Sequence, residues 1–154
     1  QGYQWFDLTS EKEEIILEKS LVAEEKLSTF LCQVFDDFQL EPSNLALVGF
    51  SQGCMLSINI GLTSNKNFNC IVGFSGKIID KENLSRRITS KTKMLLIHGD
   101  LDAVVPPNHL LEAKDFLIRN KIDAETKMIK NCDHHIPIEA SSIALNYIKK
   151  NLSI

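Results

Sequence analysis

The chain has 154 residues, of which 44% are hydrophobic and 24% are charged, and its formal net charge at pH 7 is -3. This length suffices for one domain with a hydrophobic core and is too short for two ordinary ones, so we predict a single domain over residues 1–154. Because there is no surplus of positive charge, nucleic acid and anionic membrane surfaces are excluded as expected main partners.

The four cysteines are scattered without CxxC spacing, at Cys32, Cys54, Cys70 and Cys132. Three of them lie in hydrophobic runs, which is typical of reduced thiols, so we predict no disulfide. No hydrophobic run approaches the roughly 18 residues of a membrane span, and the N-terminus lacks the order of a signal peptide. We therefore expect a cytoplasmic protein without stable membrane insertion.

The first predicted element is helical. Ser10 and Glu13 have the spacing of a capping box, and hydrophobic residues then recur at helical spacing until shortly before Pro42. This pattern predicts one helix, or two in succession, over residues 11–39. The periodic residues are Leu27, Phe30, Leu31, Val34, Phe35 and Phe38.

Beyond Pro42, short hydrophobic runs alternate with helical patterns. The runs predict strands that are buried on both faces, at residues 45–50, 70–74, 94–98 and 124–129. The helical patterns lie at residues 52–63, 107–120 and 138–151. This alternation predicts the α/β class, with a mainly parallel sheet in a three-layer α/β/α arrangement. In such sheets, reactive groups gather where the strands end.

Two similar segments follow predicted strands, GFSQG at residues 49–53 and GFSG at residues 73–76. Ser51 fits the GxSxG pattern and lies between a strand and a helix, which is the setting of a nucleophile elbow. Ser75 has a lysine where the second glycine should stand, so we interpret it as a serine at a strand end near the pocket. Ser51 is therefore the predicted nucleophile.

The neighbours of Ser51 fit this interpretation. Gly49 and Gly53 are expected to lack bulk so that the strand and the helix can approach each other. The main-chain N–H of Gln52, at the start of the helix, would point at an oxyanion and gain from the helix dipole.

A serine nucleophile needs a base that is oriented by a carboxylate, and in this class of fold the acid precedes the histidine along the chain. The loop HGDLDAVVP at residues 98–106 carries two aspartates. Both could be ordinary turn residues. We select Asp102 as the acid because the Val-Val-Pro segment after it would bury and fix its carboxylate, whereas Asp100 could support the turn.

The base should follow the last strand, where the segment NCDHH at residues 131–135 offers His134 and His135. Four potential metal ligands stand in a row here, but adjacent loop residues cannot easily all turn towards one ion, and no HxxxH or CxxC spacing accompanies them. We predict no metal and no cofactor. His98 and His109 are expected to have structural roles.

Together, GFSQG, HGDLDAVVP and the histidine loop before a hydrophobic helix resemble the phospholipase/carboxylesterase family of α/β-hydrolases, which includes acyl-protein thioesterases. The resemblance extends from Trp5-Phe6-Asp7 to the end of the chain. It implies that Ser51 is the nucleophile, Asp102 the acid and His134 the base. The implied function is the hydrolysis of carboxylic esters or thioesters, on small or lipid-like acyl esters or on acylated proteins. The alternative is a truncated, catalytically impaired member that acts as a binding or vestigial protein.

The resemblance also implies that the family's N-terminal strands and oxyanion loop are missing ahead of Trp5. Those strands would flank the predicted strand 45–50, which is too hydrophobic to serve as an exposed edge. We therefore expect this strand to pair with a second copy of the chain or with a separately supplied N-terminal fragment.

Overall fold

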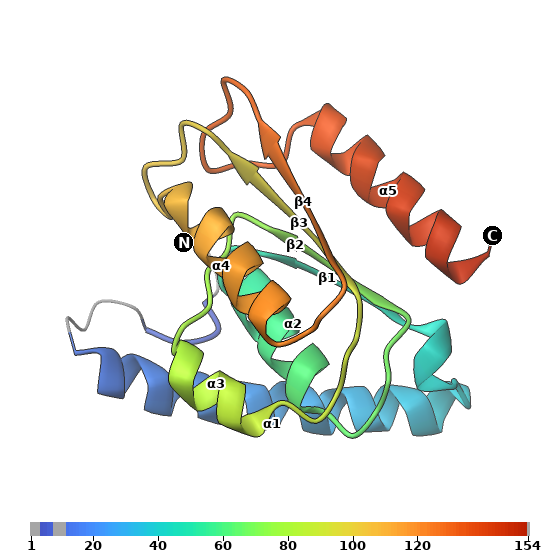
Figure 1. Cartoon of the computed structure of the whole chain (residues 1–154). Coiled ribbons are helices and arrows are strands. Elements are labelled where there is room, and N and C mark those ends of the chain that lie inside the picture. The colour runs from blue at the N-terminus through green and yellow to red at the C-terminus, as the bar shows by residue number, and fades with distance from the viewer. Residues whose placement is uncertain (1–3, 8–11, 154) are drawn as a thin grey trace.

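The computed structural model describes residues 4–7 and 12–153. Its centre is a sheet of four parallel strands in the order β1-β2-β3-β4, with helices on both faces (Figure 1). The strands are β1 (Ala46–Phe50), β2 (Cys70–Phe74), β3 (Met94–Gly99) and β4 (Ala124–Ile129). The predicted α/β class with a parallel sheet is confirmed.

The helices of the described residues largely follow the predicted pattern. They are α1 (Glu13–Phe38), α2 (Gln52–Thr63), α3 (Lys81–Arg87), α4 (Asn108–Arg119) and α5 (Ile138–Leu152), with a short 3-10 helix η1 (Pro42–Asn44). Two of these elements, α3 and η1, were not predicted. With seven residues, of which Leu84 alone is buried, α3 is too short to show a helical period.

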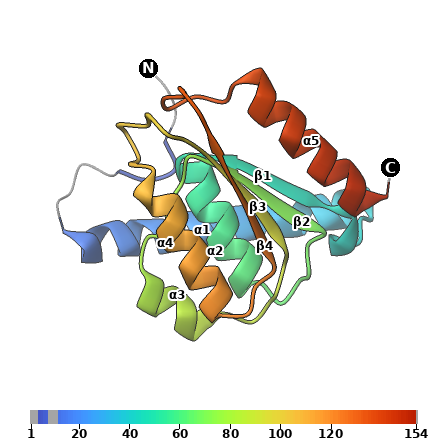
Figure 2. The same cartoon turned by 45° about the horizontal axis from the view of Figure 1, so that its top comes forward.

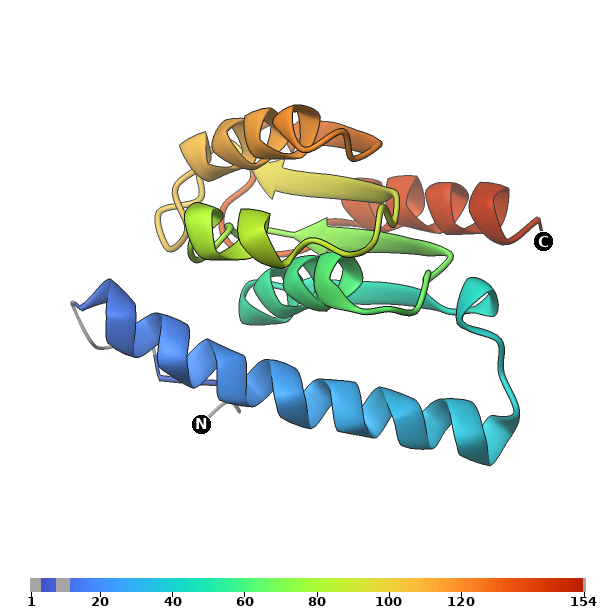
Figure 3. The ribbon, with the colours of Figure 1, turned by 60° about the horizontal axis from the view of Figure 1, so that its bottom comes forward.

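Side chains of the central strands point alternately to the two faces of the sheet. Ile71, Met94 and Leu96 pack with residues of α2, α3 and α4 in one core. Val72 and Leu95 pack with residues of α5 in the other. Figure 3 shows the same division, with α5 on one side of the sheet and the other helices on the opposite side. Both faces of the central strands are therefore buried.

The long helix α1 packs mainly against α2, and Leu47 of β1 also packs against the cluster that these two helices form (Figures 2 and 3). Leu31 and Phe35 are buried against Ile60 of α2. Phe30 and Phe38 of the periodic pattern lie in the helix as predicted but are exposed, because they lie outside the stripe that meets α2. Ser10 of the predicted capping box lies outside the described residues. The helix follows Lys12, whose side chain makes no capping hydrogen bond.

The two outer strands differ from the prediction of burial on both faces. In β4, exposed or half-buried side chains fill every position before the last. In β1, Val48 and Phe50 are exposed, because β1 lies at the edge of the sheet and its ladder partner among the described residues is β2. Pairing of this edge with another chain stays a prediction. None of the described helices has the length and hydrophobicity that crossing a membrane requires.

Candidate active site

Ser51 stands in the single-residue turn between β1 and α2. Its backbone has φ 53° and ψ -116°, a strained conformation for a residue with a side chain, as expected of a nucleophile elbow. The turn is fixed because the N–H of Ser51 donates to the carbonyl of Phe74 at 2.8 Å, and its carbonyl accepts from Met55 at 3.2 Å. The side chain is thereby directed to the edge where the parallel strands end.

The two glycines of the motif are not equivalent. A Cβ added at Gly49 would lie 2.2 Å from the carbonyl oxygen of Gly53, so any side chain there would collide with the first turn of α2. A Cβ added at Gly53 would meet nothing nearer than Nε1 of Trp5, at 3.8 Å. The predicted need for a small residue therefore holds at Gly49, and the prediction was wrong in extending it to Gly53.

His134 joins Ser51 to Asp102, although the three residues come from different loops. His134 Nε2 lies 3.1 Å from Ser51 Oγ, and His134 Nδ1 lies 2.7 Å from Asp102 Oδ2. An ionised carboxylate only accepts hydrogen bonds, so Nδ1 carries the proton and Nε2 is left to accept from the serine hydroxyl. The arrangement can therefore take a proton from Ser51.

The carboxylate of Asp102 is fully buried yet held as an anion. Its Oδ1 accepts hydrogen bonds from the backbone N–H groups of Val104 at 3.0 Å and Val105 at 2.8 Å. Burial raises the pKa of the Asp102 carboxyl, but the hydrogen bonds from His134, Val105 and Val104 outweigh burial and leave the pKa below its usual value. The Val-Val-Pro segment thus fixes this side chain as predicted, through its main-chain N–H groups.

The other candidate residues lie outside this arrangement. His135 is exposed and its Nδ1 contacts the carboxylate of Asp133. The carboxylate of Asp100 accepts a hydrogen bond from the N–H of Cys132 at 3.3 Å, so it links its own turn to the histidine loop. Ser75 is buried at the end of β2, and its N–H donates to the carbonyl of Ile97 at 2.9 Å.

His98 is buried behind Asp102, where its Nε2 lies 2.8 Å from the carbonyl oxygen of Val105 and 3.4 Å from Asp102 Oδ2. Burial lowers the pKa of His98, and the contacts with Val105 and Asp102 only partly offset this effect. Its neutral ring ties the segment that holds Asp102 to the end of β3.

Close packing of main chains brings the histidine loop to the site. A Cβ added at Gly99 would lie 2.2 Å from the carbonyl oxygen of Cys132 and 2.7 Å from that of Asp133. Only glycine lets the loop lie this close to the end of β3. The ring of Phe50 also packs on His134, with 4.7 Å between ring centroids. Sequence reasoning missed both contacts, although a glycine at a strand end signals such an approach.

Gln52 uses its main chain and its side chain differently. No acceptor among the described residues takes its main-chain N–H, as is usual for the first residue of a helix, and its role towards an oxyanion stays a prediction. Its side chain is hydrogen-bonded to Trp5 and Phe6 of the N-terminal segment. No pattern in the sequence indicated this second contact.

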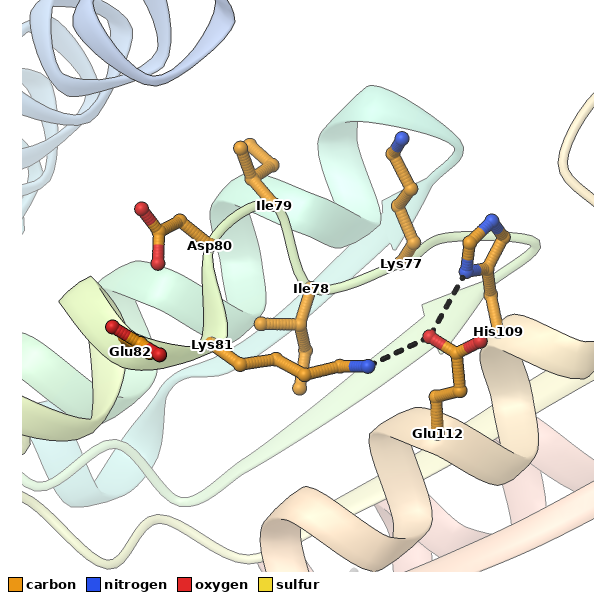
Figure 4. Close-up of a pocket in the computed structure, with 8 residues that line it drawn as sticks. All are labelled: Lys77, Ile78, Ile79, Asp80, Lys81, Glu82, His109 and Glu112. Atoms are coloured by element: carbon orange, nitrogen blue, oxygen red, sulfur yellow. Dashed lines mark hydrogen bonds and ion pairs between the residues drawn. The ribbon is translucent and has the colours of Figure 1, made fainter. Parts of the chain in front are cut away.

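A charged pocket of about 450 Å³ lies between the loop after β2 and the start of α4 (Figure 4). Glu112 lines it from α4, and its carboxylate lies 2.7 Å from Lys81 Nζ and 3.5 Å from His109 Nδ1. The hydrogen bond from Lys81 is the main reason that the pKa of Glu112 is lowered. None of the predicted site residues lines this pocket, and His109 is occupied by its contact with Glu112, in keeping with a structural role.

Within residues 4–7 and 12–153, no group of three His, Cys, Asp or Glu side chains could hold a metal ion. The four cysteines are unbridged, and Cys132 is buried in the histidine loop.

Comparison with known proteins gives a consistent result. The phospholipase/carboxylesterase family matches residues 1–152. Acyl-protein thioesterase 1 of Yarrowia lipolytica is 30% identical over 118 residues, which are 72% of this chain and 52% of the relative. Acyl-protein thioesterase 1 of Saccharomyces cerevisiae is 32% identical over 126 residues, which are 76% of this chain and 54% of the relative.

A solved structure agrees with these sequence matches. The crystal structure of esterase PE8 is similar with a TM-score of 0.91 and 35% sequence identity, over 97% of this chain and 71% of that protein. The chain thus spans about half the length of the two curated relatives and 71% of the length of the solved esterase.

Proposed function

Because the chain belongs to the phospholipase/carboxylesterase family of α/β-hydrolases, we propose that it carries the site of a serine hydrolase that cleaves carboxylic esters or thioesters. The observation that carries the proposal is the chain of hydrogen bonds from Ser51 Oγ through His134 to Asp102. An unassisted serine hydroxyl is a poor nucleophile at neutral pH. This chain of hydrogen bonds would supply the base that the hydroxyl needs to attack an ester or thioester carbonyl.

The reaction would run through an acyl-enzyme. His134 Nε2 takes the proton of the Ser51 hydroxyl as Oγ attacks the substrate carbonyl, and the main-chain N–H of Gln52 stabilises the oxyanion. The imidazolium then gives its proton to the leaving alcohol or thiol. Water attacks the acyl-serine by the same steps, which releases the carboxylic acid and restores the serine. Asp102 keeps the imidazole in the productive tautomer and stabilises its positive charge.

The substrate is an acyl ester or thioester, and the names of the two yeast relatives make an acylated protein one candidate. The test compares p-nitrophenyl butyrate with palmitoyl-coenzyme A, using the wild type and the Ser51→Ala variant. We expect the wild type to cleave at least one of them and Ser51→Ala to fall to the uncatalysed background. A folded wild-type protein that cleaves neither would contradict the proposal and favour the alternative of a catalytically impaired binding protein.

A further inference from the structure

The side-chain amide of Gln52 binds the main chain of a segment far away in the sequence. Its Oε1 accepts from the N–H of Trp5 at 2.8 Å, and its Nε2 donates to the carbonyl of Phe6 at 2.7 Å. Donor and acceptor of the amide are thus both used on two consecutive residues. A pair of hydrogen bonds fixes direction as well as distance, so the segment is held at the first residue of α2.

Further contacts anchor the rest of this segment. Phe6 is buried with Ala23 of α1, Met55 of α2 and Val105. Asp7 pairs with Lys19 Nζ at 3.1 Å. Within the described residues 4–7, the Gln52 amide is therefore the contact that holds the main chain of Trp5.

The indole of Trp5 lies beside the elbow and is half exposed. A Cβ added at Gly53 would lie 3.8 Å from Trp5 Nε1, so the ring borders the residue two positions after Ser51. Trp5 is 50% exposed, and its exposed surface borders a hollow that Phe6, Ile15 and Val22 also line. Covering such a surface with hydrocarbon is favourable, and an aromatic ring offers it at little cost in conformational entropy.

We propose that the side chain of Gln52 is a positioning residue that holds Trp5 beside Ser51, and that the indole of Trp5 is a specificity-determining wall for the hydrocarbon chain of the substrate. The inference rests on the proposed function, because it concerns the same site. The hydrocarbon chain can belong to the acyl group or to the alcohol, and the assay below distinguishes the two.

The position of Trp5 can be measured without any substrate, because it is the sole tryptophan of the sequence. Gln52→Met keeps the length of the side chain and the main-chain N–H but removes both hydrogen bonds. We expect its fluorescence to shift to longer wavelength and to be quenched more strongly by acrylamide. The matched control is Gln33→Met on the exposed surface of α1, which should behave as the wild type. If the emission and the quenching of Gln52→Met equal those of the wild type, the proposed positioning role of Gln52 is overturned.

Kinetics test the role of the indole. We compare p-nitrophenyl acetate with p-nitrophenyl octanoate, and ethyl acetate with octyl acetate, so that the chain lengthens first on the acyl side and then on the alcohol side. In one of the two series, Gln52→Met and Trp5→Ala should raise KM for the long substrate about tenfold, the loss expected for part of an aromatic contact surface. The change in kcat for the short substrate should be smaller than this rise in KM, and only the matched control Gln33→Met is expected to keep the wild-type kcat.

The outcomes separate the two proposals. If the variants lose rate on short and long substrates alike, or keep the wild-type KM in both series, the specificity role is overturned. If the wild type cleaves no ester at all, the proposed function fails, while the fluorescence comparison still decides whether Gln52 positions Trp5. Thermal unfolding of the variants, compared with Gln33→Met, shows whether a kinetic change reflects the site or a general loss of stability.

Discussion

The unequal environments of the two motif glycines lead to opposite expectations for the same substitution. In Gly49→Ala, the added Cβ would lie 2.2 Å from the carbonyl oxygen of Gly53 and 2.6 Å from the N of Cys54, well inside the 3.0 Å that real Cβ contacts respect. Both partners are main-chain atoms of α2, so the elbow itself must move. Overpacking of this kind costs about 2–3 kcal/mol, which corresponds to a fall in Tm of roughly 5–10 °C for a chain of this size.

The rate of hydrolysis should also fall in Gly49→Ala, because the elbow carries the reacting serine. A displacement of about 1 Å at a reacting group can cost about 10²-fold in rate. Gly53→Ala should keep its Tm within about 2 °C of the wild type and its rate within a few-fold, since the added methyl group makes one ordinary contact with Trp5. The assay is thermal unfolding together with hydrolysis of p-nitrophenyl acetate. The reasoning is refuted if Gly53→Ala is as damaging as Gly49→Ala, or if Gly49→Ala behaves as the wild type.

Three further predictions concern buried polar groups. Asp102→Asn should lower kcat roughly 10³- to 10⁴-fold with little change in KM, because the amide no longer holds the productive tautomer of His134; steady-state kinetics showing an unchanged kcat would contradict this. Glu24→Ala should cost about 2–3 kcal/mol in urea unfolding, since the buried Nδ2 of Asn59 loses its acceptor at 2.6 Å, whereas Glu25→Ala on the exposed surface should cost almost nothing. Burial lowers the pKa of His98, so the folded state binds this proton more weakly than the unfolded chain; its contribution to stability is present above the unfolded value of about 6.5 and is lost as the pH falls below it. His98→Gln should therefore flatten the dependence of the urea midpoint between pH 7.5 and pH 5.5, and an unaltered slope would show that another group causes it.

The alternation of hydrophobic runs and helical patterns predicted most of the fold. The predicted strands at 70–74 and 124–129 coincide with β2 and β4, and the predicted helix at 52–63 coincides with α2. These elements are bounded by turn residues and are long enough to show a hydrophobic run or a helical period, unlike the seven-residue α3. Burial of whole strands was less predictable, because a strand's neighbours in the sheet depend on tertiary pairing, and β1 and β4 lie at the edges.

The site was predictable as far as spacing reflects chain order. The residues proposed for catalysis follow the ends of three parallel strands, and the topology brings those ends to one edge of the sheet. Spacing left His134 and His135 open, since only the fold of the loop places the first within reach of Ser51 and directs the second outward. The amide contact of Gln52 joins residues that lie 46 and 47 positions apart, a separation at which no local pattern gives a signal.

The central claim is that His134 activates the hydroxyl of Ser51. The most direct test is the rate at which a fluorophosphonate labels the protein, with the modified residue located by mass spectrometry, in the wild type, His134→Gln and His135→Gln. The account predicts a single adduct on Ser51 that forms at least about 10²-fold more slowly in His134→Gln and at the wild-type rate in His135→Gln. Labelling of another serine, or equal rates in the wild type and His134→Gln, would contradict it.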